Sequence, residues 1–383
     1  MIRLRKILLG LVAGLVVSLT VSGCTAMRTF VTANAPRAQM GACGRIGGCA
    51  GAYVSGAEGA ALQRGDYNAA IASYSEIAAT APNDENALVG RGLAYLANGN
   101  YEPAIANFTD AIRLDPNDAL AHNDRGVAYY RQGNYAQAIG EYNDTIRLVT
   151  ERTIRPAWLT DAYWNRAAAY FAQGDYRRSI ADYDTAIGFL PGGGTLKRPS
   201  EQAPESPRQA AAHQDRGFAY AKSGDYDRAI ADFTAALNFQ DPKEPLTYFD
   251  RGNAYFAKGD RDTASGDYHT AAQMLADAMA ETAADPVTLN AAAWILATCP
   301  DSQFRQGITA VGYAKQACDL TSRENPEYLD TLAAAYAENG DFSQAAETEH
   351  QAISKTTIAF QISTFRKRLE LYESSKPYRS DLK

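Results

Sequence analysis

Residues 85–118 read ENALVGRGLAYLANGNYEPAIANFTDAIRLDPND, and this stretch decides the fold. Its first half places Leu88, Gly92 and Tyr95 four and then three residues apart, which is the spacing of one helix face. The pair Gly99-Asn100 then interrupts the helix, because both residues tolerate the left-handed backbone that ends helices. The stretch therefore begins with a helix and a tight turn.

The second half of this stretch predicts a second helix that packs on the first. Ala104, Phe108 and Ala111 fall on one face, and the pattern stops at Pro116. Small residues on both helices allow the two helix axes to approach closely. Residues 85–118 are thus predicted to form one helical hairpin.

The turn triplet, which is glycine, then Asp or Asn, then an aromatic residue, returns along the chain. Its copies are Gly65-Asp66-Tyr67, Gly99-Asn100-Tyr101, Gly133-Asn134-Tyr135, Gly174-Asp175-Tyr176, Gly224-Asp225-Tyr226 and Gly340-Asp341-Phe342. The first three copies lie 34 residues apart. Such a period is typical of stacked repeats that contact only their neighbours and present a long concave surface. The pattern favours a protein that holds other proteins.

The repeating units carry a further shared pattern. They are 51–84, 85–118, 119–152, 160–193 and 210–243, with a weaker copy at 245–278, where Arg261 replaces the aromatic residue. Small residues stand at positions 8, 20 and 27 of a unit, aromatic residues at 11 and 24, and proline at 32; unit 85–118 matches them all. By this pattern, residues 51–359 resemble the tetratricopeptide repeat. The resemblance implies an all-α, right-handed superhelix of hairpins with a C-terminal capping helix, which is a scaffold and not a reaction.

Five units share an arginine at position 7 and a carboxylate or amide at position 23. The pairs are Arg91 and Asn107, Arg125 and Glu141, Arg166 and Asp182, Arg216 and Asp232, and Arg251 and Asp267. Each member lies eight residues from the turn glycine, so an antiparallel hairpin sets the two opposite each other. We predict an ion pair or hydrogen bond that fixes the register of the two helices, which adds more to specificity than to net stability. The alternative is that these arginines bind a ligand.

The sequence divides into seven segments. These are 1–23, a lipoprotein signal peptide; 24–50, a lipidated flexible tether; 51–193, an array of four hairpins; 194–209, a Pro- and Gly-rich loop; 210–285, further hairpins; 286–359, a divergent hairpin and a terminal repeat; and 360–383, a capping helix and tail. Segment 194–209 is either a hinge or a surface loop on a continuous superhelix.

The amino terminus has the features of an export signal. A basic start precedes an apolar run from Ile7 to Leu19, which is too short for a stable membrane span. The ending at 21–24, Val-Ser-Gly-Cys, resembles a bacterial lipoprotein signal, which implies a lipid on Cys24. Thr25 in place of Asp implies, by the sorting rule of such lipoproteins, the outer membrane, facing the periplasm. The alternative is a simple secretory signal or an uncleaved anchor that contains Cys24.

Four cysteines remain besides Cys24, an even number that suits an oxidising compartment. We predict a disulfide between Cys299 and Cys318, whose segments should form one hairpin, and a local one between Cys43 and Cys49. None of them has the Cys-x-x-Cys spacing, and the four histidines do not cluster with them. We therefore expect no metal site and no haem.

The C-terminal helix carries one apolar stripe, Phe365, Leu369 and Tyr372, beside three basic residues at 366–368. The stripe predicts a helix that closes the end of the stack. The alternative is that the basic residues form a patch that contacts a membrane or an anionic partner.

Composition and motifs argue against several functional classes. The net charge is −7, and loss of the three basic residues of the signal takes it to −10, a poor match for nucleic acid. The sequence has neither the Gly-x-Ser-x-Gly motif of a hydrolase nor a Walker loop. His122 and His213 both stand at position 4 of their units, where we expect packing spacers. We expect no catalytic residues, no cofactor and no enzymatic activity.

A groove is the remaining candidate for a binding site. In the family, positions 2, 5, 9, 12 and 13 of the first helix line the concave face. The candidates at these positions are Asn123, Tyr130, Arg131, Trp164, Phe171, Phe218, Lys222, Phe249, Asn253 and Phe256. These aromatic and polar residues suit an extended or helical peptide with apolar anchors. The sequence thus predicts a non-enzymatic, membrane-anchored periplasmic adaptor for envelope proteins; the alternative is a self-associating structural module of an envelope complex.

Overall fold

The computed structural model describes residues 57–150, 158–190, 207–240, 243–281, 285–380 and 382. These residues form 17 α-helices and no β-strand, in eight hairpins and a final single helix. The all-α repeat fold predicted from the sequence is therefore confirmed. The predicted signal peptide and tether, with Cys24, Cys43 and Cys49, lie outside the described residues. Among the described helices, none is both long and apolar enough to cross a bilayer.

The helices follow one another as antiparallel partners, first helix and second helix of each hairpin. They are α3 (Ala57–Arg64) and α4 (Tyr67–Thr80), α5 (Glu85–Ala97) and α6 (Tyr101–Leu114), α7 (Ala119–Gln132) and α8 (Tyr135–Thr150), α9 (Leu159–Ala172) and α10 (Tyr176–Phe189), α11 (Pro207–Lys222) and α12 (Tyr226–Phe239), α13 (Pro245–Lys258) and α14 (Arg261–Glu281), α15 (Pro286–Thr298) and α16 (Gly307–Leu320), α17 (Pro326–Glu338) and α18 (Phe342–Ser354), and α19 (Ala359–Glu373). Helix α11 begins inside segment 194–209, three residues before the predicted start of its unit.

The first two residues of the turn triplet have different roles: the glycine ends one helix, and the residue after it precedes the next helix as its N-cap. Each turn glycine has a positive φ, for example +80° at Gly174 and +83° at Gly224, as expected for a left-handed helix end. The following residue is not left-handed: Asp175 has a φ of −86° and caps the next helix, its side chain accepting a hydrogen bond from the backbone N–H of Arg178. Asn100 likewise has a φ of −94°, so of the pair Gly99-Asn100 only the glycine adopts the left-handed backbone.

The small residue at position 8 permits the close helix approach within each hairpin. A methyl group added at Gly92 would lie 2.7 Å from Phe108 Cε1, and one at Gly252 would lie 2.7 Å from Tyr268 Cε1. The aromatic residue at position 24 therefore fills the space that the glycine leaves open. This packing continues along the array and gives it an elongated core instead of a central one.

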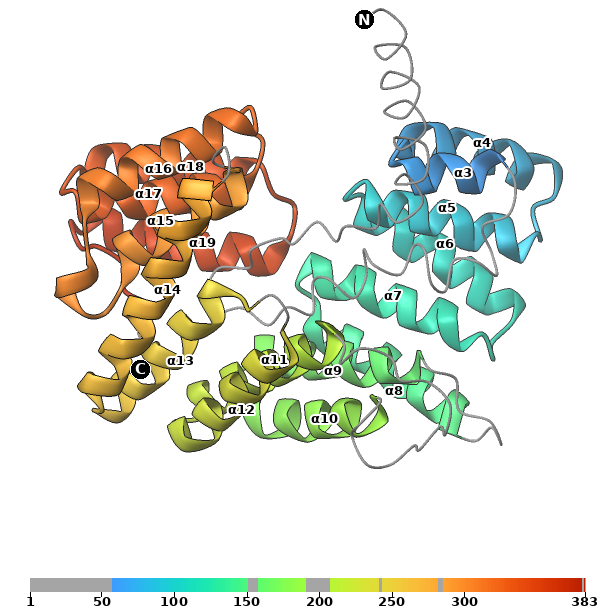
Figure 1. Cartoon of the computed structure of the whole chain (residues 1–383). Coiled ribbons are helices and arrows are strands. Elements are labelled where there is room, and N and C mark those ends of the chain that lie inside the picture. Colours follow the sequence, from blue (N-terminus) through green and yellow to red (C-terminus); the bar gives the residue numbers. More distant parts are fainter. Residues whose placement is uncertain are drawn as a thin grey trace, which may run out of the picture.

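The hairpins follow a curved path, from α3 and α4 through α9–α12 and round to α15–α19 (Figure 1). The first helices of successive hairpins contact each other directly, as α5 does α7 and α7 does α9, which is typical of the inside of a curved stack. The two arms also meet, because Tyr101 Oη lies 2.9 Å from Thr357 Oγ1 in the loop before α19.

Helix α19 closes the stack as predicted. Phe365 and Tyr372 are both 1% exposed, and Leu369 is buried with them. Arg368 departs from the alternative of a basic surface patch, because its side chain is also buried, at 2% exposure. Of the three basic residues, only the last, Arg368, therefore packs inside the C-terminal module, which we define as α15–α19.

Candidate functional site

The predicted pairs between positions 7 and 23 are present in all five hairpins. Arg216 donates to Asp232 through Nε at 2.8 Å and through Nη2 at 2.6 Å, and Arg91 Nε donates to Asn107 Oδ1 at 2.7 Å. The other three are Arg125 with Glu141, Arg166 with Asp182 and Arg251 with Asp267. These register pairs join the two helices of each hairpin and leave no arginine of this set available as a ligand-binding group.

Burial and hydrogen bonding act in opposite directions in these pairs, as Arg166 and Asp182 show. Burial raises the pKa of Asp182 above its ordinary value, even though hydrogen bonds from Arg166 act in the opposite direction. At Arg166 the balance is reversed, because the contacts with Asp182 raise the pKa of the arginine in spite of its burial. Such opposing effects are typical of buried ion pairs, which specify alignment more than they add net stability.

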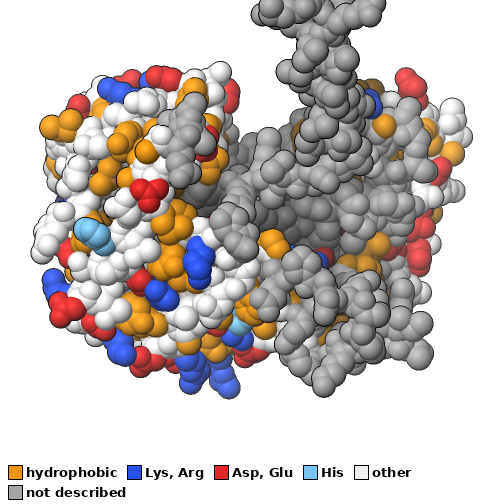
Figure 2. Space-filling view, viewed as in Figure 1, with side chains coloured by type: hydrophobic (Ala, Val, Ile, Leu, Met, Phe, Trp, Pro, Cys, Tyr) orange, Lys and Arg blue, Asp and Glu red, His pale blue; other side chains and the backbone are white. Residues whose placement is uncertain are grey.

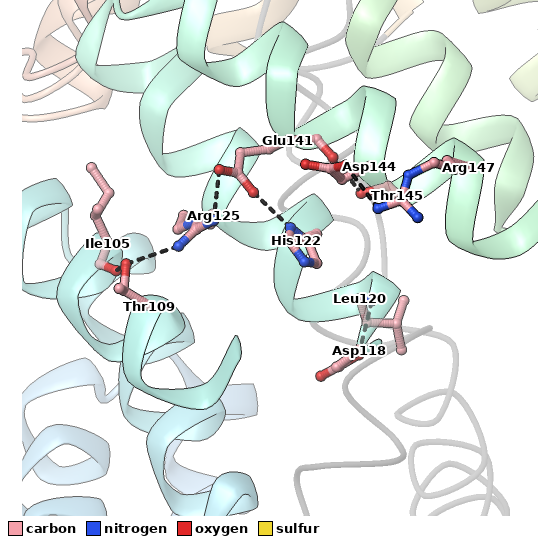
Figure 3. Close-up of polar contacts among 10 residues, drawn as sticks. All are labelled: Ile105, Thr109, Asp118, Leu120, His122, Arg125, Glu141, Asp144, Thr145 and Arg147. Atoms are coloured by element: carbon pink, nitrogen blue, oxygen red, sulfur yellow. Dashed lines mark hydrogen bonds and ion pairs between the residues drawn. The ribbon is translucent and has the colours of Figure 1, made fainter. Parts of the chain in front are cut away.

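Both position-4 histidines extend a register pair. His122 Nδ1 lies 2.8 Å from Glu141 Oε2, and Figure 3 shows Glu141 between His122 and Arg125. His213 Nδ1 lies 3.0 Å from Asp232 Oδ1 in the same way. The expected packing role holds, and the contact with the acid is a feature that the sequence analysis missed, although a constant spacing of 19 residues between histidine and acid marks it.

A second polar pattern, not predicted from the sequence, joins neighbouring units. At three successive junctions a side chain at position 5 of one unit hydrogen-bonds to position 6 of the next. The contacts of this inter-repeat ladder are Asn165 Nδ2 to Asn123 Oδ1 (3.2 Å), Trp164 Nε1 to Asp215 Oδ2 (2.8 Å) and Gln214 Nε2 to Asp250 Oδ2 (2.8 Å). All six side chains are buried.

The ladder sets the register of the first helices α7, α9, α11 and α13. The same two positions, 5 and 6, meet at each junction. The remaining positions of one first helix are therefore also aligned with the equivalent positions of the next. The ladder crosses from Trp164 on α9 to Asp215 on α11, so the repeats on either side of segment 194–209 pack together. The side of these four helices that carries positions 9, 12 and 13 is called the inner face below.

Seven of the ten predicted groove residues are buried in this structure. They are Asn123, Tyr130, Trp164, Phe171, Phe218, Phe249 and Asn253. Their rings and amides contact other parts of the repeats: Phe218 packs edge-on against Phe233 at 5.2 Å between ring centroids, and Tyr268 Oη donates to Asn253 Oδ1 at 2.9 Å. Burial also raises the pKa of Tyr130, with Tyr135 and Asp215 adding to the shift. These residues hold neighbouring helices together.

The other three predicted groove residues are partly exposed: Arg131, Lys222 and Phe256. Arg131 and Lys222 both stand at position 13 of their units, and Phe256 stands at position 12 with Arg261 over its ring at 4.8 Å. In this conformation they are the members of the predicted set that an approaching ligand reaches first. Elsewhere, the described surface visible in Figure 2 mixes basic, acidic and apolar side chains.

The predicted Cys299–Cys318 disulfide is absent, and this prediction is wrong for a geometric reason. Both cysteines are buried free thiols. Cys299 follows the last residue of α15, whereas Cys318 lies near the far end of α16, whose first residue is Gly307. The eleven residues between Gly307 and Cys318 span about 16 Å of helix, far beyond the Cα separation of about 7 Å that a disulfide tolerates. Burial raises the pKa of each thiol to about 12. Within the described ranges no cluster of His, Cys, Asp and Glu could hold a metal ion.

A buried ionic cluster lies in the C-terminal module, and the sequence analysis missed it. Arg368 on α19 forms an ion pair with Asp330 on α17, and its guanidinium lies 4.8 Å from the ring centroid of Trp294 and 4.5 Å from that of Tyr378. Glu349 on α18 is also fully buried, and burial together with the nearby Asp330 raises the pKa of its carboxyl group well above its ordinary value. Arg368 is thus the cation that faces the buried acid Asp330.

Glu327 gives this module a pH dependence that can be measured. Burial raises its pKa to about 8, Asp330 adds to the shift, and Gln361 and Arg368 oppose it. The folded state therefore keeps a proton that the unfolded chain releases near pH 4.5, so stability falls as the pH rises from about 4.5 to 8. We expect a slope of up to about 1.4 kcal/mol per pH unit from this group.

The substitution Glu327→Gln should flatten this slope in urea unfolding at several pH values. Part of the slope will remain, because burial also raises the pKa values of Asp330 and Glu349. The exposed Glu324→Gln is the matched control and should leave the slope as it is. A slope that is the same in the wild type and in Glu327→Gln would show that Glu327 is ionised in the folded protein.

Comparison with protein families finds matches within the first five repeating units. Models described as tetratricopeptide repeat match residues 59–106, 89–150, 160–189 and 210–241. The chain contains tetratricopeptide repeats. The weaker copy at 245–278 and the C-terminal module lie outside the matched residues, although the register pair Arg251–Asp267 is present there. A search among curated proteins returns no match.

Solved structures of tetratricopeptide repeat proteins match parts of the chain. The crystal structure of MamA is 24% identical over 49% of this chain and 96% of MamA, with a TM-score of 0.40. A tetratricopeptide repeat protein from Parabacteroides merdae is 15% identical over 76% of this chain and 98% of its own, with a TM-score of 0.44. PilW, a type IV pilus biogenesis factor, is 16% identical over 56% of this chain and 88% of PilW, with a TM-score of 0.46.

Proposed function

We propose that the protein is a non-enzymatic scaffold that binds a segment of another protein on the inner face of its middle repeats. The observation that carries this proposal is the inter-repeat ladder, since it lines up equivalent positions of four consecutive first helices. A continuous surface on a stack of repeats suits an extended partner better than a small molecule, because such a partner contacts several units at once.

The residues of this surface indicate the chemistry of the partner. Position 12 forms a row of apolar side chains, of which Phe256 is partly exposed and the other three are buried in this structure, and position 13 places two basic residues beside it. The two rows are Tyr130, Phe171, Ala221 and Phe256, and Arg131, Ala172, Lys222 and Ala257. An apolar row next to spaced cations suits a segment that combines apolar anchors with carboxylates.

The cellular place of this scaffold is a second part of the proposal, supported by the amino-terminal sequence alone. Lipid attached to Cys24, with the tether at 24–50, would hold the repeats at the outer membrane, facing the periplasm. Labelling with radioactive palmitate tests this, and equal labelling of the wild type and Cys24→Ala would contradict it. The competing proposal is a structural module that binds a second copy of itself, which a concentration-dependent mass of the protein would reveal.

A charge-reversed inner face tests the scaffold function. We expect the double variant Arg131→Glu, Lys222→Glu of the full chain to lose the proteins that co-purify with the wild type, because both cations of position 13 then repel an acidic partner. The matched control is Arg113→Glu together with Arg147→Glu, two residues whose side chains are 67% and 56% exposed on second helices. Retention of the same partners by the inner-face variant would contradict the proposal.

A further inference from the structure

The C-terminal tail after α19 turns back and is anchored on α15. Tyr378 stacks over Arg368, as described above, and Arg379 Nη2 contacts Glu338 Oε2 at 2.6 Å. Ser380 is fully buried; its backbone N–H donates to the Thr298 carbonyl oxygen at 2.9 Å, and the two hydroxyl groups also lie 2.9 Å apart. The tail is therefore held in one place up to residue 380.

Two residues further on, the tail reaches the repeats. Leu382 is 2% exposed and belongs to an apolar cluster with residues of three first helices. These are Phe171 of α9, Phe218 and Ala221 of α11, and Ala254 of α13.

The cluster that holds Leu382 coincides with the predicted groove. Phe171 and Phe218 were both predicted as groove residues, and Phe171 and Ala221 belong to the apolar row at position 12. Because they are buried, these residues do not line an open groove in this structure. The same buried cluster contains Leu382, which comes from the tail outside the repeats. Outside this cluster the apolar side chain of Leu382 would be exposed to water, which is unfavourable.

We propose that the C-terminal tail is an internal ligand of the inner face, and that a client segment binds by displacing Leu382. This inference rests on the scaffold function proposed above and adds its regulation. The occupant of the site is an aliphatic side chain on an irregular segment, so the client is a segment with a leucine-like anchor.

Displacement of the tail is inexpensive compared with opening the fold. Leu382 lies after α19 on a tail whose described residues, 374–380 and 382, form no helix, so releasing it leaves α19 and its buried stripe in place. Because the tail is tethered, it competes at a high effective concentration, which weakens the apparent affinity of a client. The tail therefore sets a threshold for binding.

A labelled peptide provides the test. The probe is fluorescein-labelled KPYRSDLK, the sequence of residues 376–383, and its binding to the full chain is followed by fluorescence anisotropy. We expect the variant Leu382→Asp, and a chain that ends at residue 381, to bind the probe about tenfold or more tightly than the wild type does. A probe with aspartate in place of its leucine should not bind any of these proteins.

The matched control is Leu320→Asp, since Leu320 is 59% exposed on α16 and belongs to no buried apolar cluster of the described residues. This control should bind the probe as weakly as the wild type. Equal affinities for the wild type and the two tail variants, or no binding by either tail variant, would overturn the proposal. A wild type that is dimeric and becomes monomeric on Leu382→Asp would also overturn it, because the tail would then serve a second copy.

These outcomes separate the two proposals. If the tail variants fail to bind the probe while Arg131→Glu, Lys222→Glu still loses the co-purifying partners, the internal ligand is refuted and the scaffold stands. If neither the probe binds nor the partners depend on the inner face, both proposals fail.

Discussion

Replacement of Arg368 by methionine should lower the free energy of unfolding of the C-terminal module by about 3–5 kcal/mol, the cost of breaking a buried ion pair from one side. The variant keeps a long side chain in the space between Trp294 and Tyr378 but leaves the Asp330 carboxylate buried without its cation. Glu349 is an acid and cannot replace the positive charge. Trp294 lies beside the lost guanidinium, so its fluorescence during urea unfolding reports on this module.

Two comparisons sharpen this prediction. Arg366→Met, on the exposed side of the same helix, should change stability by no more than about 0.5 kcal/mol. Lowering the pH should recover part of the stability lost in Arg368→Met, because burial already raises the pKa of Asp330 and the unpaired carboxyl group takes up a proton readily. A loss below about 1 kcal/mol, or one that does not depend on pH, would show that the cluster is not held by this arginine.

Charge reversal at Arg216 should have the next largest effect, a loss of about 3–5 kcal/mol in urea unfolding. Arg216 contacts Asp232 within its own hairpin and Asp184 of the preceding hairpin at 2.6 Å. In Arg216→Asp three acidic side chains face one another, and two of them are largely removed from water. The repulsion strains both the hairpin and its junction with the preceding unit.

The reciprocal change at Asp232 tests whether the pair sets the register. The double variant Arg216→Asp, Asp232→Arg should recover about 1 kcal/mol or more relative to the single variant, since opposite charges meet again. Recovery will be incomplete because Asp184 remains opposite an acid. The matched control is Arg228→Asp, whose side chain is 68% exposed, and it should change stability little. A double variant no more stable than the single one would contradict the register function.

The sequence predicts the parts of this fold that repeat with a fixed spacing. The turn glycines, the hairpins and the pairs such as Arg166–Asp182 recur at constant distance from one turn, so a single unit explains all of them. The inter-repeat ladder follows the same geometry but uses three different donors, an asparagine, a tryptophan and a glutamine, at its three junctions. A search for one residue type at a fixed position therefore misses the ladder, whereas a search for any hydrogen-bonding side chain at positions 5 and 6 would detect it.

Contacts between segments far apart in the sequence cannot be predicted from the repeat spacing. The Cys299–Cys318 disulfide was predicted because both residues belong to one hairpin. The prediction is wrong because they lie at opposite ends of that hairpin. The burial of Arg368 depends on α17 and on the tail, and the burial of Phe171 and Phe218 is shared with Leu382, 164 residues further along the chain from Phe218. No local spacing signals any of these contacts.

The most direct measurement of the central claim is site-specific crosslinking in cells that produce the full chain. A photo-reactive residue replaces Phe256, the partly exposed aromatic residue of the inner face, or Leu320, an exposed residue on α16. We expect a discrete partner protein to be crosslinked from position 256 and not from position 320, with a higher yield when Leu382 is replaced by aspartate. The same partner captured equally from both positions, or from position 320 alone, would contradict the inner face as the binding surface.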